Sequence, residues 1–347
     1  MHPVATPVLS RASWVACLWV ALLAAPPVQA QSALNSGDAL VEKREMKAWL
    51  VRIQEAANKR SYQGTVIVSS GATVASSRIS HYCEGRNQFE RIDALDGQPR
   101  HVVRQNEQVH TVWPEHRVAM VEQRDQMSSF PGLLQAGGEH VTDFYDLKFT
   151  GQERVAGREA NVLMLRAKDG HRYGYRLWAD KSTGLLLRTE VLADSGTVLE
   201  SSAFSEVAVG THPPLESLLQ PIRRLEGYRI SHPALVPVRL EDEGWRLTSG
   251  VPGFRQVSCI KRPADSPLRP SRSAEQPRLQ AVYSDGLTYV SVFIEPFRAE
   301  RHTRPMQAAI GATQTLMRRK GEWWITVMGD VPAPTLRRFA ASLEHTP

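Results

Sequence analysis

The sequence predicts a mainly β, α+β protein, with a large antiparallel sheet curved around a helix and a smaller α+β domain after it. Three observations favour this class. One amphipathic helix comes early, and short strand patterns then follow one another without helices between them. A proline-rich segment, residues 211–233, divides these strand patterns into two groups. A parallel α/β fold would alternate strands with helices, which this chain does not do.

Residues 39–59 predict one amphipathic helix. Its apolar residues recur at three- and four-residue spacing, and basic residues lie between them. The apolar positions are Met46, Trp49, Leu50, Ile53 and Ala57. We expect this face to pack against the sheet.

Eleven segments after the helix have the period-two pattern of short strands and are rich in Val, Ile, Tyr and Phe. Turn residues such as Asp96-Gly97 and Asp194-Ser195-Gly196 separate them. The segments are residues 62–69, 74–83, 88–92, 101–105, 109–113, 117–122, 147–153, 160–168, 172–179, 185–192 and 198–207. This order predicts an antiparallel meander.

A second, smaller domain is predicted near the C-terminus. Residues 211–233 contain four prolines and no strand pattern, which is typical of a domain linker. Strand patterns follow at 245–248, 256–261, 279–283, 288–295, 310–317 and 323–328, and a helix pattern at 334–343. The predicted parts are therefore a signal peptide (1–30), an N-terminal domain (31–210), a linker (211–233) and a C-terminal domain (234–347).

The first thirty residues have the features of a secretory signal. Arg11 precedes an apolar run at 14–25, and Val28-Gln29-Ala30 forms a small-residue ending. The alternative is an uncleaved membrane anchor, but the run is shorter than the ~20 residues of a spanning helix. We expect cleavage after Ala30 and export to the periplasm. In that oxidising compartment Cys83 and Cys259 either pair or serve as two small buried hydrophobes.

The net charge of +6 is concentrated in the C-terminal part of the chain. Residues 31–223 carry 23 Lys/Arg and 24 Asp/Glu, whereas residues 224–347 carry 18 and 12. In an exported protein this excess favours an acidic partner, either a polypeptide or lipid phosphates, over nucleic acid.

Basic residues beside two predicted strands are the candidate partner-binding residues. A single basic hairpin is usually a solvated turn, but the regional excess of charge favours an interface, and Arg and Trp are enriched at interface hot spots. The candidates are Arg298, Arg301, Arg304, Arg318, Arg319, Lys320 and Trp324. Trp323 and Trp324 face opposite sides of a strand, so we expect one in the core and the other exposed beside the cations.

Residues 124–143 are apolar without strand alternation and contain several glycines. They predict either a lid over a hydrophobic cavity or a short helix that fills the core. Strands 160–168 and 185–192 are apolar on both faces, so either part of the sheet surface is left for a lipid or a partner chain, or loops fill it entirely. The candidate lipid-binding residues are Met127, Phe130, Leu133, Leu134 and Met164.

The sequence offers no catalytic signature. It contains no G-x-S-x-G, H-E-x-x-H, C-x-x-C, P-loop or G-x-G-x-x-G motif. His110, Glu115 and His116 surround one predicted turn, but isolated histidines at strand ends are more often solvated than metal-bound. We therefore predict a binding protein without metal or cofactor rather than an enzyme.

Four segments resemble the MucB/RseB family: Ser61-Tyr62-Gln63-Gly64-Thr65-Val66, Arg176-Leu177-Trp178-Ala179-Asp180, Thr183-Gly184-Leu185-Leu186-Leu187-Arg188 and Tyr283-Ser284-Asp285-Gly286-Leu287. The resemblance implies a large N-terminal domain like the lipoprotein carriers LolA and LppX, which is a half-barrel sheet wrapped on a helix, and a small α/β C-terminal domain. It also implies a negative regulator of the sigma-E envelope stress response. Such a regulator binds the periplasmic region of a membrane-spanning anti-sigma factor, shields it from proteolysis and is released by lipid or lipopolysaccharide signals.

Two other classes of function remain as alternatives. The first is a periplasmic carrier of lipids or lipoproteins, which would transfer its cargo between membranes. The second is an envelope hydrolase, whose activity would depend on a single Ser or His.

Overall fold

The computed structural model describes residues 30–123, 130, 140–263, 268, 277–302 and 304–346, with side chains from Arg44 onward. The chain divides into two compact units, residues 1–41 and 42–347, and the second contains both β-sheets. No helix within the described residues is long and apolar enough to cross a membrane. The predicted signal peptide lies outside the described residues, except for Ala30.

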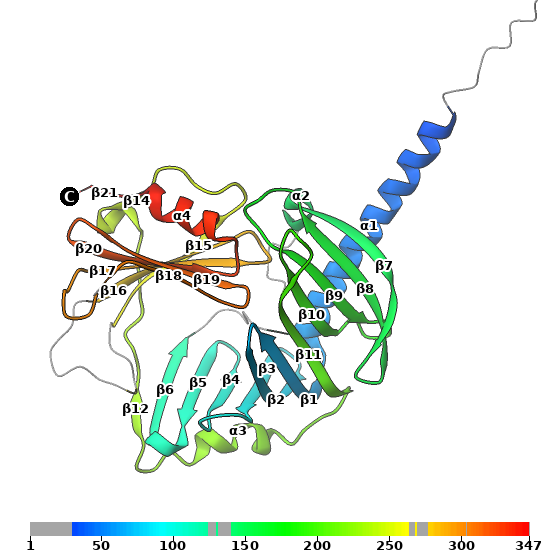
Figure 1. Ribbon diagram of the computed structural model, residues 1–347. Coiled ribbons are helices and arrows are strands. Elements are labelled where there is room, and N and C mark those ends of the chain that lie inside the picture. The colour runs from blue at the N-terminus through cyan, green and yellow to red at the C-terminus, as the bar shows by residue number, and fades with distance from the viewer. Residues whose placement is uncertain are drawn as a thin grey trace, which may run out of the picture. The chain divides into compact units, whose positions relative to one another are not determined.

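Twelve strands form the large sheet (Figure 1). They are β1 (Tyr62–Ser70), β2 (Thr73–Glu84), β3 (Asn87–Ala94), β4 (His101–Gln105), β5 (Gln108–Trp113), β6 (Val118–Gln123), β7 (Tyr145–Val155), β8 (Arg158–Ala167), β9 (Gly174–Asp180), β10 (Leu186–Leu192), β11 (Val198–Val209) and β12 (Arg229–Ser231). Their order is β12-β6-β5-β4-β3-β2-β1-β11-β10-β9-β8-β7. All neighbours are antiparallel except β12 and β6, so the predicted antiparallel sheet is confirmed. The predicted single meander is instead two meanders, β1–β6 and β7–β11, joined where β1 pairs with β11.

Helix α1 (Ala30–Lys59) packs on this sheet through the face that the sequence predicts. Met46, Leu50 and Ile53 are buried in one cluster with side chains of β8, β9 and β10. The guanidinium of Arg52 donates to the carbonyls of Lys181 (3.1 Å) and Ser182 (2.6 Å), and so holds the helix against the β9–β10 turn. This packing confirms the predicted combination of one helix and a large sheet.

The β9–β10 turn owes its shape to Asp180 within the Asp-x-x-Thr-Gly segment. Its Oδ1 accepts hydrogen bonds from the backbone N–H groups of Ser182 (3.1 Å) and Thr183 (2.7 Å), and its Oδ2 accepts one from Arg158 (2.6 Å). Burial alone would raise the pKa of Asp180, but these hydrogen bonds hold the pKa well below its ordinary value. This segment of the family resemblance therefore has a structural explanation.

A seven-stranded sheet and helix α4 (Ala333–Ser342) form the smaller α+β part. The strands are β13 (Val236–Pro237), β15 (Arg255–Arg262), β16 (Arg278–Ser284), β17 (Tyr289–Pro296), β18 (Met306–Ile310), β19 (Thr313–Lys320) and β20 (Trp323–Gly329), in the order β13-β15-β16-β17-β20-β19-β18. A short pair, β14 (Trp245–Leu247) with β21 (Leu343–His345), completes it. Leu336 and Phe339 of α4 enter the core of this part.

The predicted strand 310–317 is wrong in one respect. Ile310 ends β18 and Thr313 begins β19, so Gly311 and Ala312 form a tight turn inside the predicted strand. Gly311 has a φ of 57°, which glycine adopts without steric cost in a hairpin turn. Since a side chain at Gly311 would collide with the hydroxyl of Ser70, glycine also allows this turn to approach β1 closely.

The predicted linker contains regular structure. Helix α3 (Leu215–Arg223) packs on β3, β4 and β5, with Leu218 buried, and Arg91 donates to the carbonyl of Ser217 at 2.6 Å. Strand β12 follows and extends the large sheet beyond β6. The segment that connects the two sheets therefore adds a helix and a strand to the large part. The domain boundaries at residues 210 and 234 stay a prediction.

A buried ion pair joins the large and small parts. The Arg172 side chain is 0% exposed, and its Nε lies 2.7 Å from Oδ2 of Asp285, which is equally buried. The hydroxyl of Tyr145 donates to the same carboxylate oxygen (3.2 Å). The guanidinium also lies over the rings of Phe144 (4.3 Å) and Phe254 (4.9 Å). Residues from both parts thus share one buried polar network.

Candidate functional site

The predicted partner-binding residues do not form a single patch. Arg319 and Trp324 are directly opposite each other in β19 and β20 and so share a face of the small sheet. Arg318 and Lys320 lie on the other face, because neighbours in a strand alternate. On that side Lys320 donates to the carbonyl of Leu343 at the end of α4.

Trp324 is buried, contrary to the prediction that one tryptophan of this pair is exposed. It is 5% exposed and stacks on His302, with the ring centroids 4.8 Å apart and the planes 8° apart. Trp323 is partly buried against the core of the small part. The cause is the segment after β17, which folds back over Trp324 and carries Phe297 (6.1 Å between rings) with it.

This returning segment, residues 297–302, carries Arg298 and Arg301, and its Phe297 ring lies beside Arg319 of β19. The ring nitrogen Nδ1 of His302 accepts the backbone N–H of Arg298 (2.9 Å), and the N–H of His302 donates to the carbonyl of Arg298 (2.8 Å). Burial lowers the pKa of His302, although Glu295 nearby acts in the opposite direction. The guanidinium of Arg319 lies 3.9 Å from the ring centroid of Phe297. We name Arg298, Arg301 and Arg319 the arginine face.

Arg304 and Arg318 are both exposed and lie outside the arginine face. No acidic side chain within the described ranges forms an ion pair with either of them. Arg304 lies two residues before β18, and Arg318 lies on the α4 side of β19. The predicted basic cluster is therefore distributed over two faces of the small sheet.

The predicted lipid-binding residues are only partly described. Met127, Leu133 and Leu134 lie outside the described residues. Phe130 packs against the buried clusters on the large sheet, and its ring lies 5.3 Å from that of Phe204. Met164 is half-buried and alternates along β8 with Leu163 and Leu165, which face α1. Phe130 therefore contributes to the core of the large part.

A hollow that the sequence reasoning missed lies between α1 and strands β7 and β8. Its volume is about 370 Å³, and its lining consists of Glu45, Met46, Trp49, Phe149 and Asn161. Phe149 is 38% exposed, although it is a large apolar residue. Trp49 belongs to the predicted buried face of α1 but is only half-buried, because it lies at the rim of this hollow.

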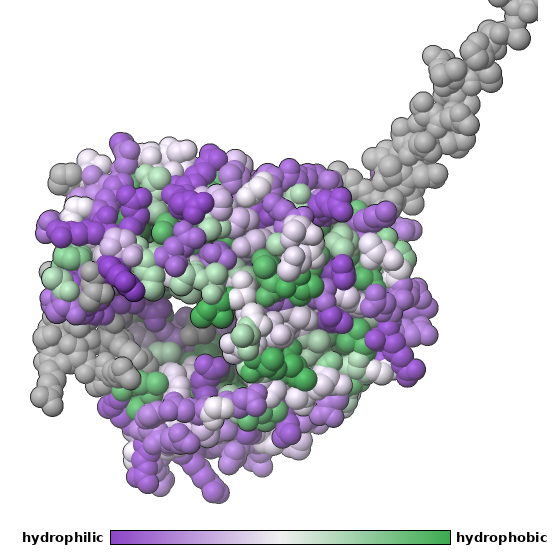
Figure 2. All heavy atoms as spheres, viewed as in Figure 1, coloured by the Kyte–Doolittle hydropathy of each residue, from purple (hydrophilic) through white to green (hydrophobic). Residues whose placement is uncertain are grey.

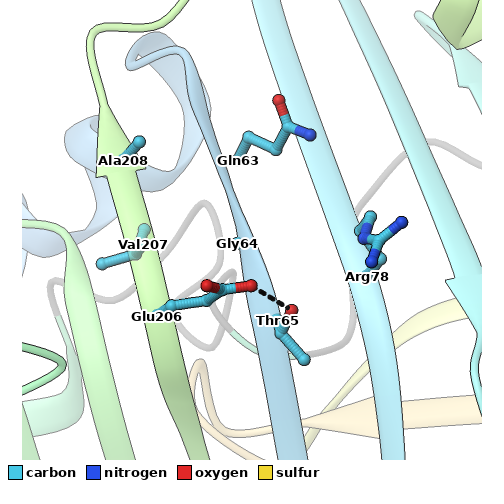
Figure 3. A pocket seen from close by; sticks show the side chains of 7 residues that line it. All are labelled: Gln63, Gly64, Thr65, Arg78, Glu206, Val207 and Ala208. Carbon is cyan, nitrogen blue, oxygen red and sulfur yellow. Dashed lines mark hydrogen bonds between the residues drawn. The ribbon is translucent and has the colours of Figure 1, made fainter.

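A second hollow, of about 360 Å³, lies on the resemblance segment that begins at Ser61 (Figure 3). Thr65 donates to the carboxylate of Glu206 (2.9 Å), and Arg78 extends from the neighbouring strand. A side chain at Gly64 would approach the carbonyl of Glu206 to 2.3 Å, so close strand packing requires glycine there. The charged side chains that line this hollow, Arg78 and Glu206, are exposed. On the face of the molecule drawn in Figure 2, hydrophilic side chains surround several hydrophobic patches near the centre.

The described residues hold no group of three or more His, Cys, Asp or Glu side chains placed to bind a metal ion. His110 contacts Gln108 (3.2 Å), and His116 contacts Gln98 (3.4 Å). Cys83 and Cys259 are both free thiols, which agrees with the interpretation of two separate residues and not with a disulfide.

Comparison with known proteins identifies relatives along most of the chain. The models of the MucB/RseB N-terminal and C-terminal domains match residues 45–223 and 239–344. The sigma factor AlgU regulatory protein MucB of Pseudomonas aeruginosa is 30% identical over 303 residues, which cover 85% of this chain and 89% of that protein. The sigma-E factor regulatory protein RseB of Escherichia coli K12 is 24% identical over 300 residues, covering 86% and 90%.

Solved structures agree with the sequence relatives. The Pseudomonas aeruginosa MucA/MucB complex matches with a TM-score of 0.66 and 28% identity, over 87% of this chain and 99% of that chain. A crystal structure of MucB in complex with MucA(peri) matches with a TM-score of 0.64 and 27% identity, over the same shares. Because the models of the N-terminal and C-terminal domains both match this chain, in that order and over most of its length, the chain belongs to the MucB/RseB family.

Proposed function

We propose that this chain is a periplasmic negative regulator of a sigma-E type stress response. It binds the periplasmic region of a membrane-spanning anti-sigma factor and shields that region from proteolysis, so its action is steric and not catalytic. The observation that carries this proposal is the match, over nearly the whole length of both chains, to a relative solved in complex with MucA(peri). The signal at residues 1–30, cleaved after Ala30, would place the chain in the same compartment as such a partner.

The arginine face is the proposed contact for the anti-sigma factor. Stacking on Phe297 limits the conformations of the Arg319 side chain before binding. Hydrogen bonds between the Arg298 backbone and His302 fix the loop that carries Arg298 and Arg301. Ordered side chains lose less conformational entropy on association than mobile ones. The surplus of six positive charges in residues 224–347 favours an acidic segment in the partner.

Direct titration tests the proposed function. Chain purified from the periplasm is titrated by calorimetry with the periplasmic region of the anti-sigma factor from the same cell. We expect saturable binding that weakens as salt rises, because exposed charges attract through a screened field. A folded chain that does not bind at low salt would contradict the proposal.

Charge reversal at the arginine face is expected to weaken this complex. The triple variant Arg298→Glu, Arg301→Glu and Arg319→Glu should lower affinity at low salt by about 10- to 100-fold and flatten the salt dependence. The matched control reverses three exposed arginines elsewhere in the small part, Arg239, Arg246 and Arg255. Equal losses in both triples would assign the effect to net charge alone, and no loss in the first would place the interface elsewhere.

Lipid sensing is a second candidate function, and the hollow beside α1 favours it. Trp49 and Phe149 give it an apolar wall, and an acyl chain gains about 0.8 kcal/mol for each CH₂ that it buries. A lipid with brominated acyl chains should quench the fluorescence of wild-type chain more than that of Trp49→Phe. Equal quenching of both proteins would exclude this hollow as the lipid site.

A further inference from the structure

His302 closes the turn that carries two residues of the arginine face. The backbone carbonyl of Arg298 accepts the N–H groups of Arg301 (3.1 Å) and His302 (2.8 Å). The ring nitrogen Nδ1 of His302 accepts the backbone N–H of Arg298 at 2.9 Å and so closes the same turn a second time. His302 is only 8% exposed. The positions of Arg298 and Arg301 therefore depend on a hydrogen bond to a buried, titratable side chain.

The partners of the His302 ring determine where its proton lies. Because Nδ1 accepts a hydrogen bond, it carries no proton, and the neutral ring has its proton on Nε2. Nε2 lies 3.6 Å from Oε1 of Glu295, so this N–H faces a carboxylate. The ring also lies flat against Trp324, with 8° between the planes. The closed turn thus requires a neutral His302.

Charged groups of neighbouring segments act on the protonation of His302. Glu295 of β17 attracts a proton to the ring, but its other carboxylate oxygen already accepts a hydrogen bond from Arg278 of β16 (3.1 Å). Arg301 in the turn and Arg278 both repel a proton, and Arg319 of β19 lies over the adjacent Phe297 ring. Burial is the largest effect, and it lowers the pKa of His302 from its ordinary value of 6.5.

We propose that protonation of His302 opens this turn and thereby weakens binding of the acidic partner at the arginine face. In the imidazolium both ring nitrogens are donors, so Nδ1–H would face the N–H of Arg298 where a donor and an acceptor now meet. Opening of the turn removes this conflict, and Arg298 and Arg301 then no longer hold fixed positions. This inference rests on the proposed function, because it describes the regulation of the same surface.

The direction of the pH effect separates this mechanism from simple electrostatics. A proton on His302 adds positive charge beside Arg301, so attraction alone would tighten the binding of an acidic partner as the pH falls. Opening of the turn has the opposite effect. The closed turn has its full stability above pH 6.5 and loses it as the pH falls below that value. The closing equilibrium falls by up to about ten-fold for each pH unit, until the folded-state pKa is passed.

NMR titration of the chain without a partner tests the hydrogen bond itself. The ¹⁵N shifts of the His302 ring, followed from about pH 8 to about pH 5, report its tautomer and its pKa. We expect an unprotonated Nδ1 at the start, a pKa below 6.5, and an Arg298 amide resonance that shifts together with the ring. A proton on Nδ1 at the start, a pKa of 6.5 or more, or an Arg298 amide that stays in place would each overturn the proposal.

Binding at two pH values tests the consequence. Calorimetry with the periplasmic region of the anti-sigma factor compares wild type, His302→Asn and the control His116→Asn, which changes an exposed histidine of another segment. The asparagine oxygen at 302 accepts a hydrogen bond but does not titrate. Between about pH 7.5 and about pH 5.5, wild type and the control should lose up to about ten-fold more affinity than His302→Asn.

Equal losses of affinity in all three proteins would overturn the proposal. A greater loss in His302→Asn than in wild type would overturn it as well. Absence of binding by every protein at both pH values would instead contradict the proposed function, and with it the effect on binding. The NMR titration would then still decide whether protonation of His302 opens the turn, so the two failures are distinguishable.

Discussion

Asp285→Asn is expected to lower the free energy of unfolding by about 3–5 kcal/mol, the usual cost of removing one partner of a buried ion pair. The substitution leaves the Arg172 guanidinium 0% exposed and without the carboxylate 2.7 Å from its Nε. It also disturbs the turn, since Oδ1 of Asp285 accepts the backbone N–H groups of Leu287 (3.0 Å) and Thr288 (2.9 Å). Urea denaturation followed by circular dichroism measures the loss.

Asp169→Asn is the matched control for this prediction. Asp169 also pairs with Arg172, but its side chain is partly exposed, and partly solvated pairs contribute roughly 1 kcal/mol or less. A loss for Asp285→Asn no greater than that for Asp169→Asn would contradict the assigned role. Because Leu287 belongs to the same buried cluster as Met46 and Leu50, the destabilisation should be detected in the large part as well as in the small one.

Glu90→Gln is expected to stabilise the protein by about 2–3 kcal/mol at pH 8 and by little at pH 4. Glu90 is 6% exposed, its Oε2 has no hydrogen-bond partner within the described residues, and burial raises its pKa to about 7 although Arg104 opposes this. Its ordinary value is 4.5. The folded state therefore favours the protonated acid, and the wild type loses stability as pH rises from about 4.5 to 7.

Unfolding midpoints at several pH values test the Glu90 prediction. Glutamine keeps the shape of the side chain and removes the charge, so the difference from wild type should grow with pH across this window. Glu84→Gln, on the exposed end of β2, should show no such trend. A gain that is equal at pH 4 and pH 8, or absent at pH 8, would mean that Glu90 carries no charge penalty in the folded chain.

The sequence predicts the strands of the large sheet well because they either alternate between buried and exposed positions at their start, as β1 does, or are short apolar runs bounded by turn residues, as β8 and β10 are. Strand β18 was missed because all five of its residues are exposed, so no alternation between buried and exposed positions marks it in the sequence. Helix α3 was missed because Pro221 lies inside it, and its packing on β3, β4 and β5 comes from residues distant in sequence.

The candidate site was predicted less completely than the fold. Charge excess identified the arginines, but strand parity divides Arg318 from Arg319. Trp324 is buried because an earlier segment, residues 297–302, folds back over it. The buried pair of Arg172 and Asp285 joins residues 113 positions apart. No local pattern relates two residues at that separation, so only the folded chain reveals their contact.

Protection from cleavage tests the central claim most directly. The periplasmic region of the anti-sigma factor is incubated with the protease that begins its destruction, with increasing amounts of chain purified from the periplasm. We expect its half-life to lengthen in proportion to the fraction bound, and the arginine-face triple variant to protect less at equal concentration. Cleavage that proceeds at an unchanged rate in the presence of saturating, folded chain would contradict a regulator that acts by shielding its partner.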